Sequence, residues 1–117
     1  MDLNAFYAAI GGDYNDVKAR LQSDELIEKF LFRFIDDPSY SELKSALSCG
    51  DIAAAFRAAH TLKGVAATLG LNRLSESSSG LTEELRPLKS LPPRDMIEIV
   101  DVEYEKVIAA LKSQNRE

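Results

Sequence analysis

The residues of this chain that could take part in chemistry lie in one turn around its only histidine. His60 is followed three and four residues later by Lys63 and Gly64. In a helix, residues at these spacings lie one turn further along the same side as the imidazole. A nucleophilic nitrogen, a neighbouring ammonium group and a position without a side chain are suited to carrying a phosphoryl group. Such a carrier needs a nucleophile, neutralisation of the phosphoryl charge and open access for the donor.

A long helix over residues 51–69 is predicted to hold this turn. Asp51 is a good N-cap for it, and Gly70 is a good residue to follow its last turn. At roughly 100° per residue, His60 lies about 120° from the middle of the apolar stripe of this helix. We therefore expect His60 at the edge of the core or outside it. The apolar stripe consists of Ile52, Ala55, Ala59, Leu62, Ala66 and Leu69.

The row of the helix that contains His60 is otherwise made of small residues, namely Ala53, Gly64 and Ala67. Small residues on an exposed row leave the imidazole accessible to a large partner. A glycine inside a helix costs about 1 kcal/mol relative to alanine, so Gly64 needs a reason. Close approach of another backbone is such a reason, and that backbone could belong to a partner or to a neighbouring helix of this chain. Likewise, Lys63 could be a solvated cation, and His60 could be structural.

Apolar residues recur at helical spacing along nearly the whole chain, and no β-type alternation is found. Asp36, Asp37 and Pro38 end one helix, and Ser39 with Glu42 forms a capping box for the next. Asn72 is expected to cap the helix that follows Gly70, and Pro87 and the pair Pro92-Pro93 interrupt the chain before the last helix. The predicted helices cover about residues 3–10, 14–21, 26–34, 39–47, 51–69, 72–88 and 96–111.

These elements predict an all-α fold, an antiparallel up-down four-helix bundle with an additional short N-terminal helix. The four longest elements are joined by short connections, which favours this topology. The short helices near the N-terminus and over residues 39–47 would then be additions to the bundle. We expect a single helical domain over residues 1–117, with the core bundle over about residues 23–113. The start at Met1 and the polar end over residues 112–117 favour a complete protein.

Composition excludes several classes of function. The net charge of -5 argues against a nucleic-acid binder, which would carry a basic surface, and suits a protein that meets other proteins. One cysteine, Cys49, excludes an intramolecular disulfide, and one cysteine with one histidine is too few for a structural zinc site. No apolar run approaches the roughly 20 residues that span a bilayer, and the N-terminus lacks the basic start of a signal peptide. We expect a cytoplasmic monomer that binds no membrane.

The region from Gly50 to Gly70 resembles the histidine-containing phosphotransfer (HPt) domain family. That family has an Ala-His-x-Leu-Lys-Gly core, preceded by Gly-Asp and followed by Leu-Gly. The chain has all three parts, and Leu74 and Leu81 match the family's next helix. The resemblance covers about residues 10–115. The matching segments are Gly50-Asp51, Ala59-His60, Leu62-Lys63-Gly64 and Leu69-Gly70.

The resemblance implies a four-helix bundle with an exposed, phosphorylatable histidine, acting between receiver domains in a multistep phosphorelay. His60 would be the phosphoacceptor, Lys63 would stabilise the phosphate, and Gly64 would let the receiver approach. The family often has a glutamine on the next helix that orients the histidine. Here the matching region is Thr82-Glu83, so Thr82 is the candidate for this role.

Three further residues are candidates for the partner surface. Phe56 is expected to be half-buried with its flank available for apolar contact, and Ala67 continues the row of small residues. Arg57 could contact the partner or simply face solvent. The serines at 75 and 77–79 are expected at a close helix contact, and the acidic pairs Asp36-Asp37 and Glu83-Glu84 on the solvated surface.

The chain has no aspartate cluster that would hold Mg²⁺ and no glycine-rich nucleotide loop. The metal is therefore expected to come from the receiver, and no cofactor or metal ligand is assigned to this chain. We expect a phosphoryl carrier without kinase activity of its own, with the receiver domains of a hybrid histidine kinase and a response regulator as partners. Two alternatives stay open: the phosphoacceptor domain of a chemotaxis-type histidine kinase, or a helical adaptor that binds receivers without carrying phosphate.

Overall fold

Seven helices and no strand make up the part of the chain that the computed structural model describes, residues 1–114. The prediction of an all-α fold is confirmed, since the helical spacing of apolar residues corresponds to one buried face on each helix. Residues 115–117 of the predicted domain lie outside the described part. The helices are α1 (Leu3–Ile10), α2 (Tyr14–Leu21), α3 (Asp24–Phe34), α4 (Ser39–Cys49), α5 (Ile52–Thr68), α6 (Asn72–Leu85) and α7 (Arg94–Gln114).

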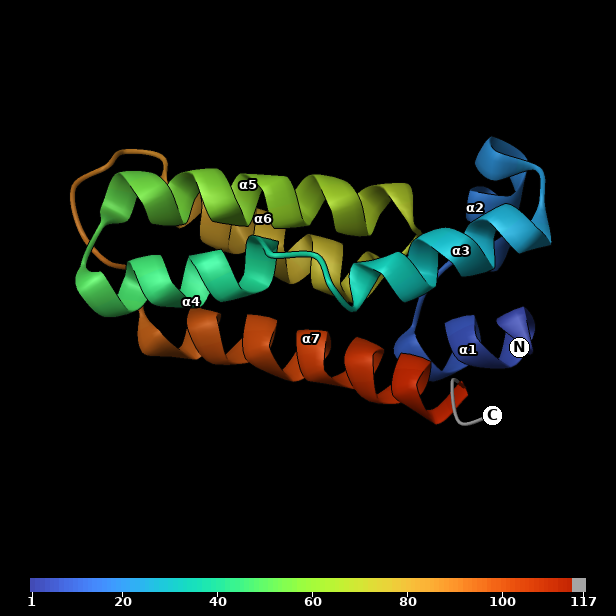
Figure 1. The fold of residues 1–117 in the computed structure, drawn as a ribbon. Coiled ribbons are helices and arrows are strands. Elements are labelled where there is room, and N and C mark those ends of the chain that lie inside the picture. The colour runs from blue at the N-terminus through green and yellow to red at the C-terminus, as the bar shows by residue number, and fades with distance from the viewer. Residues whose placement is uncertain (115–117) are drawn as a thin grey trace.

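Helices α4 to α7 form the predicted up-down bundle, in which each helix runs back along the one before it (Figure 1). Helix α5 packs along both α4 and α6, and α6 packs along α7. The helix with the histidine therefore has a bundle neighbour on each flank and one long face left open. Aliphatic side chains that solvent hardly reaches form the core between the four helices: Leu43, Leu62, Leu74, Leu81, Leu85, Val100 and Leu111.

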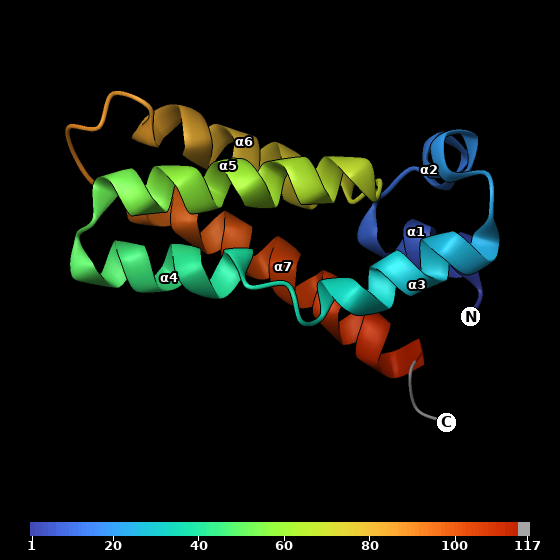
Figure 2. The same ribbon diagram turned by 45° about the horizontal axis from the view of Figure 1, so that its top comes forward.

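One member of the bundle differs from the expectation. We expected the helix over residues 26–34 as a long arm and the helix over 39–47 as an addition, and this assignment is wrong. Helix α4 packs along α5. Helix α3 lies beyond the N-terminal end of α4 and packs on α2 (Figure 2). Both helices have 11 residues, so length could not distinguish them. Which of the two helices joins the bundle depended instead on which one packs its apolar face against α5.

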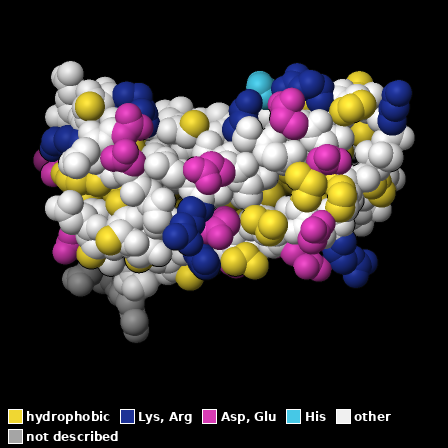
Figure 3. All heavy atoms as spheres, turned by 180° about the vertical axis from the view of Figure 1, so that it is seen from behind, with side chains coloured by type: hydrophobic (Ala, Val, Ile, Leu, Met, Phe, Trp, Pro, Cys, Tyr) yellow, Lys and Arg dark blue, Asp and Glu magenta, His cyan; other side chains and the backbone are white. Residues whose placement is uncertain are grey.

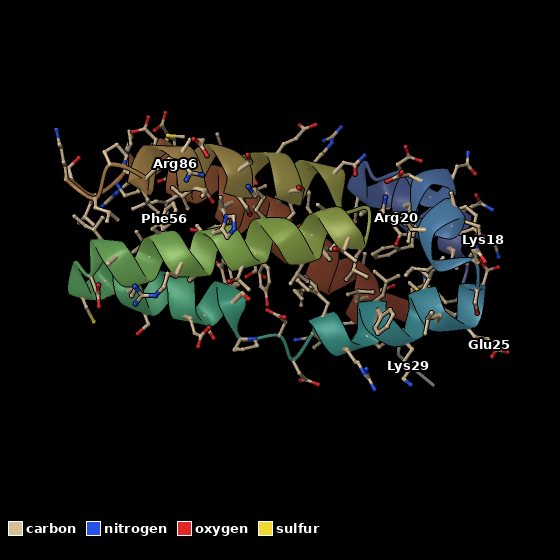
Figure 4. The ribbon with its side chains drawn as sticks, turned by 90° about the horizontal axis from the view of Figure 1, so that it is seen from above. Lys18, Arg20, Glu25, Lys29, Phe56 and Arg86 are labelled. Carbon is tan, nitrogen blue, oxygen red and sulfur yellow. The ribbon has the colours of Figure 1, made fainter. Side chains whose placement is uncertain are left out.

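The N-terminal helices close the end of the bundle where α5 finishes. The Tyr7 hydroxyl donates to the carbonyl of Leu69 at 2.6 Å, and Arg20 donates to the carbonyls of Ala67 (3.0 Å) and Thr68 (2.9 Å). Figure 4 shows Arg20 reaching from α2 toward this end of α5. The bonds to Thr68 and Leu69 satisfy carbonyl groups at the end of α5, where a helix leaves its last carbonyls unpaired, and the Ala67 carbonyl also accepts from the Gly70 N–H. The segment before the bundle therefore holds the histidine-bearing helix in place.

Both predicted ends of α5 are confirmed. The Asp51 carboxylate accepts the backbone N–H of Ala54 at 3.1 Å, as an N-cap does. Gly70 has φ +69°, and a Cβ on it would lie 2.1 Å from Val17. This position therefore requires glycine both for its left-handed backbone and for the close contact with α2.

Three other predicted helix ends are wrong. Ser39 is the first residue of α4 rather than its cap, because the Asp37 carboxylate accepts the Ser39 N–H at 2.9 Å. Asn72 is likewise the first residue of α6, which begins directly after the buried Leu71 without a side-chain cap. Helix α6 stops before Pro87, which lacks an N–H, so Leu88 leaves the predicted stripe and is exposed.

Candidate functional site

His60 lies in the middle of α5 and is exposed, as its angle from the apolar stripe predicted. Its flanking neighbours Ala59 and Leu62 are fully buried, so the helix cannot rotate to take the imidazole into the core. One turn earlier, the half-buried Phe56 presents its ring nearly parallel to the imidazole, with an interplanar angle of 16° and ring centres 6.2 Å apart. The backbone of His60 is thus fixed by the core while its ring stays open to solvent.

No close contact within the described residues requires a glycine at position 64. A Cβ placed on it would meet no atom within 4 Å outside its own helix. The alternative that a neighbouring helix of this chain needs the space is therefore excluded for residues 1–114. Ala53 and Ala67 are exposed as well, so the row of small residues lies at the surface beside His60. What the missing side chain favours is the approach of a second molecule.

Two cations come from the segments beside the imidazole: one is three residues after His60, and the other contacts Phe56, the ring next to His60. Lys63 stands on α5, and Arg86 lies directly after α6. The Arg86 guanidinium sits over the Phe56 ring, 5.2 Å from its centre, as a cation–π contact (Figure 4). From the opposite side of the molecule, the single histidine stands at the surface among lysine and arginine side chains, with an acidic side chain beside them (Figure 3). A protein of net charge -5 thus has a basic patch around its histidine.

Sequence reasoning missed Arg86. This residue lies 26 positions beyond the histidine and past the last helical turn of α6, so no local spacing connects the two. The packing of α6 along α5 brings it to Phe56. The available signal was weak: Arg86 is four positions after Thr82, one helical turn beyond the residue considered as an orienter.

Glu83 is the acidic member of this group. Its carboxylate accepts from Arg86 Nη2 at 2.8 Å and from Arg86 Nε at 3.1 Å, a bidentate arrangement. The hydrogen bond from Arg86 lowers the pKa of Glu83, and the positive charges of Arg86, Lys63 and His60 act in the same direction. Glu83 is exposed, as predicted, but it is also a partner of the cations around His60.

Thr82 is not placed to orient the imidazole. It is fully buried, and its hydroxyl donates to the backbone carbonyl of Ser78 at 2.7 Å. Among the described residues no hydrogen bond joins Thr82 to His60. Of the neighbouring serines, Ser75 lies at the contact with α5, since its hydroxyl donates to the Lys63 carbonyl at 3.4 Å, and Ser78 is fully buried. Ser77 bonds within α6, to the Leu74 carbonyl at 3.1 Å.

A groove of about 620 Å³ runs along the open face of α5 between that helix and α3, with His60 at its edge. Its walls are largely apolar. Phe30 and Phe34 line one wall from α3, and Gly64 and Val65 line the other from α5. A rigid surface element of a partner that entered this groove would therefore pass directly beside the imidazole.

The predicted partner residues do not share one surface. Arg57 lines a second groove of about 430 Å³ between α4 and α5, whereas Phe56 turns toward α6 and contacts Arg86. Gly64 lies in the first groove, and Ala67 is exposed one turn further along α5. His60 lines the first groove and lies one turn from Phe56, and its neighbour Thr61 lines both grooves.

Within residues 1–114, no group of three or more histidine, cysteine, aspartate or glutamate side chains is arranged to hold a metal ion. No helix in the same part of the chain is both long enough and apolar enough to cross a membrane.

A family model described as the Hpt domain matches residues 37–114, which is more than half of the chain. The match includes all four bundle helices, His60 and both flanking cations, and it leaves out α1 to α3. One wall of the apolar groove, with Phe30 and Phe34, therefore comes from outside the matched region. No curated protein and no solved structure matches the chain at a significant level.

Proposed function

Because the chain belongs to the Hpt domain family, whose members transfer phosphoryl groups through a histidine in phosphorelays, we propose that His60 is the carrier residue. In this proposal His60 accepts the phosphoryl group from the aspartate of one receiver domain and passes it to the aspartate of another. The observation that supports it best is Gly64, a helix-interior glycine beside an exposed histidine with open space in front of it.

The transfer needs little from this chain beyond position and charge. A lone pair of the neutral imidazole attacks phosphorus as the bond from phosphorus to the aspartate oxygen breaks, and the electrons of that bond return to the carboxylate. The product is a phosphorylated imidazolium, which releases the proton of its other nitrogen to solvent. Lys63 and Arg86 are the nearby cations that offset the charge of the transferring group. Transfer onward reverses the same steps.

The receivers of a hybrid histidine kinase and of a response regulator are the proposed partners. The apolar groove between α3 and α5 offers such a domain a surface beside His60, and the basic patch suits an acidic active site. We assign Mg²⁺ to the receiver, and Lys63 and Arg86 supply positive charge from this chain. The proposal places the protein in the cytoplasm, where it would meet both receivers.

A transfer assay tests the proposal. Receiver domains from the same organism are charged with labelled phosphate and mixed with the protein and Mg²⁺. We expect acid-labile, base-stable label on His60, and its transfer to a second receiver. The variant His60→Gln serves as a control and should take no label while keeping the helical circular dichroism spectrum.

Three outcomes would overturn the proposal. If the wild type binds receivers but takes no label, the chain is an adaptor. If label appears only when a kinase catalytic domain and ATP are supplied, His60 is the phosphoacceptor of a chemotaxis-type kinase. Label on a residue other than His60 would refute the assignment of the site.

A further inference from the structure

Glu83 places a negative charge among the cations that are to receive a phosphoryl group. Its carboxylate lies at the C-terminal end of α6 and binds Arg86 through two hydrogen bonds, at 2.8 and 3.1 Å. The same guanidinium rests over the Phe56 ring, which in turn faces the imidazole of His60. A continuous chain of contacts therefore connects this carboxylate to the reactive ring.

Two physical consequences of this placement have the same sign. A phosphoryl group on His60 brings about two negative charges, and the Glu83 carboxylate repels them. In addition, Arg86 is paired with Glu83 through its Nε and Nη2 groups. This pairing partly neutralises the charge that Arg86 would otherwise present to the phosphoryl group. The charges of Lys63 and His60 contribute to lowering the pKa of Glu83, which is consistent with Glu83 being close enough to act on a charge at His60.

We propose that Glu83 sets the phosphotransfer equilibrium by raising the free energy of phosphorylated His60. This inference rests on the proposed function of His60 as the carrier. In the outgoing step, the bond from nitrogen to phosphorus breaks and its electrons return to the imidazole, while a receiver carboxylate oxygen forms the new bond to phosphorus. Glu83 favours this direction because the step removes the phosphoryl charges from its surroundings. The residue thus biases the protein toward releasing its phosphoryl group.

The chain contains a matched control at the next position. Glu84 is also exposed on α6, but it has no hydrogen bond or ion pair with the cations of the site within the described residues. Replacing either glutamate by glutamine removes one negative charge and leaves size and net helix propensity nearly unchanged. A difference between Glu83→Gln and Glu84→Gln therefore reports position rather than total charge.

The experiment measures the equilibrium distribution of label between His60 and the receiver aspartate, with one receiver charged with labelled phosphate and Mg²⁺ at fixed concentration. For Glu83→Gln we expect the equilibrium constant to move toward His60 by about three- to tenfold, and for Glu84→Gln by less than about twofold. The difference should shrink when the ionic strength rises from about 0.05 M to 0.5 M, because exposed charges are screened over the shorter Debye length. Circular dichroism and thermal unfolding check that both variants keep the fold.

The outcomes separate this inference from the proposed function. If the wild type takes up no label at all, the carrier role fails and the inference fails with it. If the wild type is labelled on His60 but Glu83→Gln and Glu84→Gln give the same distribution, only the role of Glu83 is refuted. A shift of Glu83→Gln toward the receiver aspartate would also refute it.

Discussion

Replacement of Gly64 should raise the stability of the free protein while impairing its reaction with a receiver. Gly64 lies inside α5, and a Cβ on it would meet no atom within 4 Å outside that helix. Gly64→Ala therefore gains helix propensity without a steric cost, and the free energy of unfolding should rise by about 1 kcal/mol. For a domain of this size that corresponds to a higher Tm by about 3–6 °C.

The same position should control access of the donor. A larger side chain, as in Gly64→Leu, would stand one turn from His60 on the wall of the apolar groove. We expect it to slow label transfer from a charged receiver by at least about tenfold, because in-line transfer tolerates little displacement. Gly64→Ala should cause a smaller loss. The assays are thermal unfolding by circular dichroism and the initial rate of labelling of His60.

Gly80 provides the matched control. It lies inside α6, and a Cβ on it would have only an ordinary contact, 3.5 Å from Met96. Gly80→Ala should therefore also stabilise the fold but leave the labelling rate unchanged. A lower Tm for Gly64→Ala would show that the space in front of Gly64 is not open. Labelling of Gly64→Leu at the wild-type rate would show that this position does not control access of the donor.

Three further predictions concern the supports of the site. Arg20→Ala removes two hydrogen bonds to the end of α5 and should lower the free energy of unfolding by about 1 kcal/mol, measured by denaturant unfolding. An unchanged denaturation midpoint would show that Arg20 does not hold this end of α5 in place. Phe30→Ala should raise the Kd for a receiver about three- to tenfold, measured by titration calorimetry, whereas Phe32→Ala, half-buried but outside the groove, should not; equal effects of the two variants would exclude α3 from docking. Burial, and then the hydrogen bond to Asp101, raise the pKa of Tyr40, so the neutral phenol stabilises the fold below the ordinary pKa near 10 and this contribution is lost as pH rises above it. The difference in absorbance at 295 nm between the wild type and Tyr40→Phe should show Tyr40 ionising above the ordinary pKa of tyrosine, and ionisation of Tyr40 near pH 10 in the folded state would refute this.

Local signals predicted what depends on neighbours in the chain. Asp51 and Gly70 delimit α5 because a carboxylate cap and a left-handed glycine act within one helical turn. The exposure of His60 also followed, since the angle between two residues of one helix is set by the helix itself. Where a local signal failed, a contact from another part of the structure or a competing side chain had replaced it: Asp37 binds the N–H of Ser39, and the buried Leu71 sets where α6 begins.

The sequence by itself therefore determined where the helices lie to within a few residues, the turn that contains His60, Lys63 and Gly64, and the family to which the chain belongs. Only the tertiary structure decided which helix pairs with α5, and that Arg86 and Glu83 meet beside the imidazole. The spacing of apolar residues predicts which face of a helix is buried. It does not predict which other helix packs against that face, because this depends on side chains far apart in the chain. The charges that surround the histidine are such a long-range result, because Arg86 and Glu83 reach it only through the packing of α6 along α5.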